Sequence, residues 1–196
     1  MKPVVKSPRD CSRGEIMEFM KLVIEADEVD PEGLERRVMR AERLIFLHNK
    51  KEVIGVAATK RPGKSRKESV FRKAQSTEDP TSFTFELGWI VVNERFRGQH
   101  LSRTLVEAAL EVAAGHRIFA TTRTDNLRMQ KTIERYGFHA VGKPYPTSRE
   151  GRKYDLTLFI KQFEQVEPAA ATNRGDTQRL PDSKSHRRPR RVRFVD

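Results

Sequence analysis

The segment ELGWIVVNERFRGQHLSRTLVEAALEVAAG, residues 86–115, changes character twice. An apolar run comes first, a short basic loop with one glycine follows, and a helical repeat of apolar residues ends the segment. A strand that returns as a helix after a tight loop bares backbone N–H groups that attract anions. Gly98 removes a side chain where a phosphate must approach closely. Positive charge comes from Arg95, Arg97 and Arg103. The segment therefore indicates a pyrophosphate site, with an ordinary turn and solvated arginines as the alternative.

Charge is spread unevenly along the 196 residues, a length sufficient for one domain with its own core. The formal net charge of +12 favours anionic partners such as phosphates, nucleic acid or an anionic cofactor. Residues 165–196 have almost no apolar periodicity, and we expect a disordered basic tail there. The domain expected at 1–164 keeps 31 of the 39 basic and 23 of the 27 acidic residues, so the positive excess is not confined to the tail.

The single cysteine, Cys11, excludes an internal disulfide, and nothing in the sequence argues for secretion. No apolar stretch approaches the roughly 18 residues of a membrane helix. The first residues lack the apolar middle of a signal peptide. We therefore expect a cytoplasmic protein without membrane contact. Histidine, cysteine and acidic residues show no metal-ligand spacing, so no metal site is expected.

The apolar pattern alternates between strand and helix along the domain. Strands are predicted at 4–5, 44–48, 53–58, 83–92, 117–122, 138–141 and 154–160. Helices are predicted after a cap at Ser12 and over 31–42, 102–114 and 126–136. This order favours an α/β sandwich with a mixed sheet.

Residues 60–75 carry seven basic residues and one acidic residue between the third and fourth predicted strands. Val70 and Phe71 are expected to pin a short helix against the core. The basic side chains expected to point outward are Arg66, Lys67, Arg72 and Lys73. A basic wall at this place would suit an anionic acceptor, and a solvated, solubilising face is the alternative.

Two motifs together carry a resemblance to a known family. The loop at 95–100 reads RFRGQH, and Asn126 stands eleven residues before the glycine of the pair Gly137-Phe138. On these residues the chain resembles the GNAT superfamily of acyl-CoA N-acyltransferases, whose loop reads [QR]xxGx[GA] and which keeps this asparagine spacing. The resemblance covers roughly residues 3–162.

Two positions depart from the family pattern. His100 stands where the family prefers glycine or alanine, which puts the path of the coenzyme in question. Ile133 stands where many members carry a tyrosine as general acid for the departing thiolate. Tyr136 lies three residues later and is not assumed to replace it. The general acid is therefore left open.

The resemblance implies a GNAT-like mixed central sheet flanked by helices, with the fourth and fifth strands splayed around acyl-CoA. It implies transfer of an acetyl or other acyl group to an amine by direct attack in a ternary complex. The N–H of Val91 or Val92 would polarise the thioester oxygen. Coenzyme contacts are expected from Trp89, Ile90, Val91, Val92, Arg97, Gly98, Gln99, His100, Leu101, Ser102, Arg103 and Asn126.

Three of these expectations have simpler alternatives. Glu86, on the same strand, is the candidate general base, or else a charged residue on a solvent face. Trp89 would line the site or belong to the core. Asn126 would contact the pantetheine arm, cap a helix, or do both.

Two other functions stay open at this point. One is a nucleic-acid-associated protein on the GNAT scaffold, which modifies or binds an RNA- or DNA-linked amine, with weak contact through the basic tail. The other is a scaffold that binds coenzyme A without turnover. The amine acceptor and the acyl chain are not determined by the sequence, and a homodimer is a family habit for which no interface is visible.

Overall fold

The computed structural model describes residues 1–27 and 29–163, so the tail predicted at 165–196 lies outside the described residues. Within these ranges, seven strands form one sheet in the order β1-β2-β3-β4-β5-β7-β6. The strands are β1 (Val4–Lys6), β2 (Ala41–Asn49), β3 (Glu52–Lys60), β4 (Phe85–Val92), β5 (Ile118–Arg123), β6 (His139–Pro146) and β7 (Asp155–Lys161). Neighbouring strands are antiparallel except β4 and β5, which run parallel. The predicted mixed sheet is confirmed.

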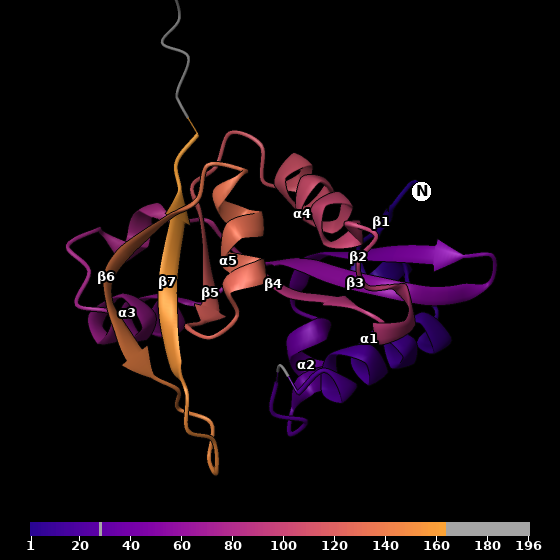
Figure 1. The fold of residues 1–196 in the computed structure, drawn as a ribbon, viewed down its shortest axis with the longest axis horizontal. Helices are drawn as coiled ribbons and strands as arrows, with labels where there is room; N and C mark the ends of the chain where they lie inside the picture. Colours follow the sequence, from indigo (N-terminus) through magenta and orange to yellow (C-terminus); the bar gives the residue numbers. More distant parts are fainter. Residues whose placement is uncertain (28, 164–196) are drawn as a thin grey trace, which may run out of the picture. The chain divides into compact units, whose positions relative to one another are not determined.

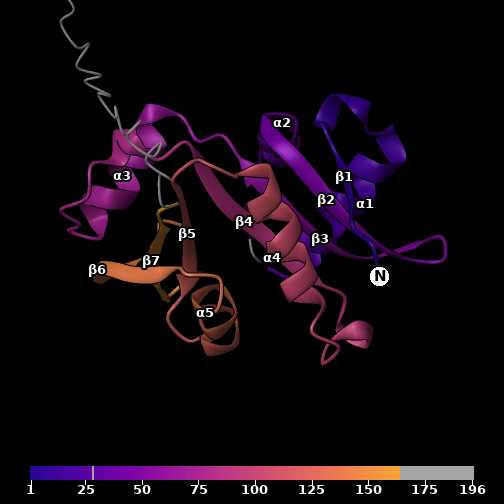
Figure 2. The same ribbon diagram turned by 90° about the horizontal axis from the view of Figure 1, so that it is seen from above.

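Helices cover both faces of this sheet (Figure 1). On one face lie α4 (Leu101–Val112) and α5 (Leu127–Glu134), and on the other lie α1 (Arg13–Glu25), α2 (Leu34–Val38) and α3 (Lys64–Lys73) (Figure 2). The short 3-10 helices are η1 (Pro8–Asp10), η2 (Pro80–Ser82) and η3 (Glu94–Phe96). In the described part of the chain, no helix has both the length and the apolar character that a bilayer crossing needs.

Strand β4 divides its side chains between these two faces. Phe85 and Leu87 are buried in the core beneath α4 and α5. Trp89 and Val91 pack into the core beneath α1 and α2. Glu86 points to this second side of the sheet, because its carboxylate pairs with a residue of α3. Alternation puts Glu86 on the face opposite Phe85 and Leu87, and the irregularity at Trp89 brings Trp89 and Val91 to the face of Glu86.

Several predicted boundaries are wrong. The helix predicted at 31–42 is only the five residues of α2, since Gly33 adopts a left-handed conformation with φ 63° and starts the helix late. Ahead of it, the Asp30 carboxylate accepts the N–H of Glu32 at 3.0 Å and forms a turn at the proline. Strand β2 then begins at Ala41, and β6 extends to Pro146, beyond the predicted residue 141.

The cap predicted at Ser12 is confirmed as a reciprocal pair of hydrogen bonds. The Ser12 hydroxyl accepts the N–H of Glu15 at 3.2 Å, and the Glu15 carboxylate accepts the N–H of Ser12 at 2.8 Å. The helix that follows buries Phe19 and Val23 completely. Capping and the apolar stripe together fix α1 against the sheet.

Candidate active site

Strands β4 and β5 stay together over three residue pairs, from Phe85 with Ile118 to Leu87 with Ala120. Beyond these pairs the strands diverge (Figure 1), and the edge of β4 that faces β5 is left without a strand. A β-bulge marks the same place, since Trp89 has a left-handed φ of 54°. The predicted splay of the fourth and fifth strands is confirmed.

The unpaired edge of β4 presents backbone amides to the gap. The N–H of Asn93 donates to the carbonyl oxygen of Ile54 on β3 at 2.8 Å. Because N–H groups alternate in direction along a strand, the amide of Val91 also points to β3 and that of Val92 points into the gap. Of the two amides that the sequence left open for the thioester oxygen, alternation favours Val92.

The loop after β4 exposes a run of amides. It starts with Asn93, whose side chain accepts the N–H of Arg95 at 3.1 Å. Gly98 and His100 then take left-handed conformations, with φ 86° and φ 59°. Among the described residues, the amides of 98–102 donate to no acceptor. Successive free amides at the start of a helix form a concave, positively polarised surface that suits an anion.

The arginines of this loop are less available than the sequence predicts. Arg95 pairs with Glu52 at 2.7 Å, and Arg97 pairs with Glu94 at 2.9 Å. Arg103 forms no ion pair within the described ranges. Backbone amides, rather than free guanidinium groups, are therefore the main donors that this loop offers to an anion.

The segment after β5 combines a cap with a core residue. Asn126 caps α5, and its side-chain oxygen accepts the N–H of Met129 at 3.2 Å. Ile133 is buried among the core residues beneath α4 and α5. The Tyr136 hydroxyl donates to Glu107 at 2.7 Å, and burial together with this hydrogen bond raises the pKa of Tyr136 to about 12. The Tyr136 hydroxyl is thus already hydrogen-bonded to a residue of α4.

On the other face of the sheet, ion pairs surround Glu86. Its Oε1 atom lies 2.6 Å from Lys60 Nζ and 3.1 Å from Arg66 Nη2. The prediction that Arg66 points outward is confirmed only in part, because its side chain is 48% exposed while its Nη2 atom pairs with the buried Glu86 carboxylate. Burial alone would raise the pKa of Glu86, but Lys60 and Arg66 outweigh it and lower the pKa to about 2. We call Lys60, Arg66, Glu86 and Tyr145 the Glu86 cluster, because the charges of Arg66 and Glu86 act on the pKa of the Tyr145 hydroxyl.

Lys60 reaches Glu86 by crossing β4 at a glycine. A Cβ atom at Gly88 would lie 2.7 Å from Lys60 Cε and 2.8 Å from Lys60 Nζ, so any side chain there would displace the lysine. The Lys60 ammonium also lies 5.0 Å from the ring centroid of Trp89. Trp89 in turn packs edge-on against Phe19 at 5.9 Å, so it both belongs to the core and borders the cluster.

The role of general base predicted for Glu86 stays a prediction. A carboxylate with a pKa of about 2 is a weak proton acceptor for an ammonium group. The ion pairs favour a different role, in which Glu86 holds Lys60 and Arg66 in place.

A second connection joins segments on either side of the gap. Arg149, in the hairpin between β6 and β7, donates to the carbonyl oxygen and the carboxylate of Asp27 at 2.6 and 2.9 Å. It also donates to the carbonyl oxygen of Val29 at 2.8 Å, and Arg152 reaches the Asp27 carboxylate at 2.6 Å. The loop after α1 is therefore fastened to this hairpin.

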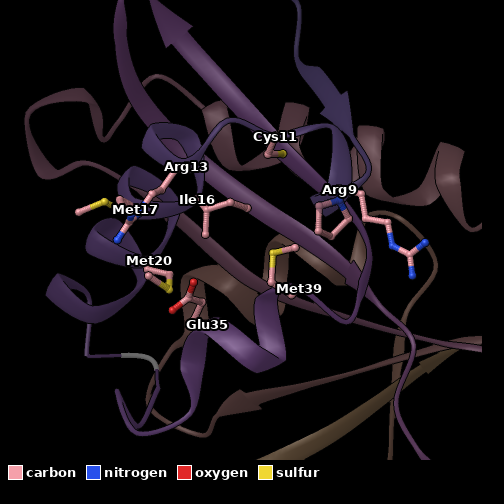
Figure 3. A pocket seen from close by; sticks show the side chains of 9 residues that line it. Arg9, Cys11, Arg13, Ile16, Met17, Met20, Glu35 and Met39 are labelled. Atoms are coloured by element: carbon pink, nitrogen blue, oxygen red, sulfur yellow. The ribbon is translucent and has the colours of Figure 1, made fainter.

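A cavity of about 430 Å³ lies elsewhere, between η1, α1 and α2 (Figure 3). Its lining includes Cys11 and three methionines, Met17, Met20 and Met39, but no residue of β4, β5 or the loop at 93–103. Cys11 therefore lines a cavity to which the residues of the gap do not contribute. In the described residues, no group of three or more His, Cys, Asp or Glu side chains is arranged to hold a metal ion.

Comparison with known proteins agrees with this geometry. Residues 14–138 match the acetyltransferase (GNAT) family. No curated protein shows a significant match to the chain. Among solved structures, ElaA from Escherichia coli superposes with a TM-score of 0.62 at 11% identity, over 83% of this chain and 100% of that chain.

Two further solved structures carry substrate names. A ribosomal-protein-alanine N-acetyltransferase from Brucella melitensis gives a TM-score of 0.59 at 20% identity, over 82% of this chain and 99% of its own. Spermidine N-acetyltransferase from Vibrio cholerae, in complex with CoA and spermine, gives 0.58 at 17% identity, over 82% and 95%. At these identities the likeness extends to the fold alone.

Proposed function

The chain belongs to the GNAT family of acetyltransferases, and from this premise we propose that it transfers an acetyl group from acetyl-CoA to an amine. The observation that carries the proposal is the run of amides at 98–102 without an acceptor in the described residues, next to the unpaired edge of β4. The first feature suits the diphosphate of the coenzyme and the second suits its amide-containing arm.

In this proposal the coenzyme makes mostly backbone contacts. The diphosphate lies against the amides of 98–102, and the pantetheine arm pairs with the edge of β4 between Trp89 and Val92. The side-chain amide nitrogen of Asn126 is available to the arm, because only the side-chain oxygen is used for the helix cap. Arg103 supplies positive charge to the loop, because the charges of Arg95 and Arg97 are already paired with carboxylates.

The reaction then needs no covalent enzyme intermediate. A neutral amine attacks the thioester carbon, a C–N bond forms, and the C–S bond breaks to release the coenzyme thiolate. The Val92 amide stabilises the oxygen that becomes negative during the attack. The proton of the amine passes to solvent water, because Glu86, with a pKa of about 2, is a poor proton acceptor and Tyr136, with a pKa of about 12, stays protonated.

Calorimetry with acetyl-CoA, followed by an assay of thiol release, tests the function. We expect one acetyl-CoA to bind per chain, and thiol release to require an added primary amine. Failure to bind acetyl-CoA at millimolar concentration would remove the proposal. Binding without amine-dependent thiol release would leave a coenzyme-binding protein without turnover, which was the alternative raised by Ile133 and His100.

The acceptor is a separate question, because the named relatives act on different amines and the fold does not choose between them. The family match gives no support to a nucleic-acid role, and the basic tail on which that alternative partly rests lies outside the described residues. A cytoplasmic location and a homodimer stay predictions.

A further inference from the structure

The Glu86 cluster lies where β4 parts from β5, on the face of the sheet opposite α4. Glu86 is opposite Phe119 in the last stretch that the two strands share. Lys60 is opposite Glu86 on β3, and its side chain runs over Gly88 towards the gap. The amides at 98–102 begin α4, on the other face. The cluster is therefore on the side from which an acceptor approaches if the coenzyme occupies the α4 side.

Positive charge exceeds negative charge in this cluster. Two cations, Lys60 and Arg66, share one carboxylate oxygen, Glu86 Oε1. Burial lowers the pKa of Lys60, the charge of Glu86 raises it, and the charges of Arg66 and of Arg37 on α2 lower it further. The Glu86 side chain is 4% exposed and that of Lys60 is 19% exposed. With Lys60 protonated the cluster has an excess of one positive charge, which a bound anion would balance.

Donors in the cluster remain available. Within the described ranges, Arg66 makes one side-chain hydrogen bond, through Nη2, and its side chain is 48% exposed, so its other nitrogens are free to donate. A guanidinium with two free N–H groups binds a carboxylate in a bidentate manner.

Tyr145 supplies an independent observation. The residue is 5% exposed, and its hydroxyl is buried without a hydrogen-bond partner in the described part of the chain. Burial raises the pKa of this hydroxyl, and the charges of Arg66 and Glu86 also act on the pKa, so the hydroxyl lies within electrostatic range of both. A buried hydroxyl without a partner is unfavourable, so a ligand that accepts its proton in a hydrogen bond gains that energy.

We propose that the acceptor amine carries a carboxylate, which is bound by Arg66 and the Tyr145 hydroxyl with the Lys60 ammonium nearby. The proposal rests on the proposed acetyltransferase function. A carboxylate carries one negative charge, which matches the excess of the cluster, and its planar shape fits the guanidinium. Glu86 is then a positioning residue that keeps Lys60 and Arg66 as donors.

Matched pairs of amines test the proposal. Each pair contains an amino acid and its carboxamide, for the common α-amino acids and for β-alanine and γ-aminobutyrate, so that the separation of amine and carboxylate is varied. For the best pair we expect kcat/KM to be at least about tenfold higher for the acid, the ratio typical of one charge-assisted hydrogen bond. Both members contain the amine, so the ratio isolates the carboxylate.

Two variants and one control identify the residues. Tyr145→Phe and Arg66→Met are each expected to reduce the acid-to-amide ratio at least about fivefold, with little change for the amide. Lys64→Met is the control, because Lys64 is on the same helix, is 79% exposed and pairs only with the exposed Glu68. This variant should keep the wild-type ratio.

The outcomes separate this proposal from the proposed function. Absence of acetyl-CoA binding removes both. Acetylation of carboxamides as efficiently as acids leaves the acetyltransferase and overturns the carboxylate site. Acetyl-CoA binding together with failure to acetylate any acid of the panel also overturns it, as does a ratio that neither Tyr145→Phe nor Arg66→Met changes.

Discussion

The two sides of the gap beyond Leu87 are built from different parts of the chain. On the α4 side, the donors are backbone amides of one short segment, 98–102. On the opposite side, they are side chains from β3, α3 and β6, which only the fold brings together. A backbone site survives most substitutions that preserve its conformation, whereas a side-chain site changes with each substitution. The difference suits a shared coenzyme on the first side and a specific acceptor on the second.

The largest effect is expected from Glu86→Gln, measured by urea unfolding at neutral pH. This change leaves Lys60 and Arg66 next to each other without their carboxylate, and the free energy of unfolding should fall by about 3 kcal/mol. The control on the other side of the gap is Glu94→Gln, which breaks an ion pair whose carboxylate is 82% exposed. Its loss should stay below about 1 kcal/mol. Equal losses for the two variants would contradict the contrast between the sides.

Acidic pH should weaken the stabilisation that the Glu86 carboxylate provides. The pKa of Glu86 is depressed in the folded protein from 4.5 to about 2, so its stabilising effect is complete above pH 4.5 and is lost as the pH falls through 2. The difference in unfolding free energy between wild type and Glu86→Gln, on the order of 3 kcal/mol, should therefore shrink across this interval. Urea unfolding of both proteins in a series of acidic buffers measures it. A difference in unfolding free energy that stays constant with pH would show that the ion pairs do not lower the pKa of Glu86 in the folded protein.

A smaller effect is expected from Gly98→Ala on the backbone side. Alanine at a φ of 86° costs about 1 kcal/mol in stability and distorts the amides at 98–102. We expect the Kd for acetyl-CoA to rise about tenfold, or about 1.4 kcal/mol, by calorimetry.

Gly115 is the matched control for this experiment. It also has a positive φ, 78°, and a Cβ atom there would likewise meet nothing within 4 Å. Gly115→Ala should lose similar stability and keep the wild-type Kd. If both variants bind acetyl-CoA equally, the loop is not the coenzyme site.

The smallest effect is expected from Tyr136→Phe. The tyrosine hydroxyl donates to Glu107 of α4, so its removal should cost about 1 kcal/mol of unfolding free energy. Turnover should change by less than about twofold. Steady-state kinetics with acetyl-CoA and the best amine measure this. A large fall in kcat with an unchanged KM would instead identify Tyr136 as the general acid and move proton transfer to the α5 side.

The backbone side could be predicted from sequence because its information is local. The apolar run, the loop glycine and the helical repeat of residues 86–115 are contiguous, and each has a fixed conformational meaning. The structure adds a contact that the local pattern cannot contain, since Arg95 pairs with the distant Glu52, whereas the pair of Arg97 with Glu94 lies within the segment itself. Glu52 lies 43 residues before its partner.

The side-chain site could not be predicted in the same way. Arg66 belongs to a run of basic residues that typically faces solvent, and only the orientation of α3 against β4 turns it towards Glu86, 20 residues away. Arg149 and Asp27 are 122 residues apart and meet through the fold alone. The late start of α2 had a visible signal, Gly33, but the preceding Asp-Pro pair gave a stronger and misleading one.

Gly88 and Lys60 also constrain how this protein evolves. Since a methyl group at residue 88 would meet the end of the lysine side chain, Gly88 is not free to vary while Lys60 keeps this position. Orthologues that keep lysine at position 60 should therefore keep glycine at position 88, and lineages that replace the lysine with a short residue should accumulate larger residues there. Such paired changes would trace, from genomes alone, where acceptor preference has shifted.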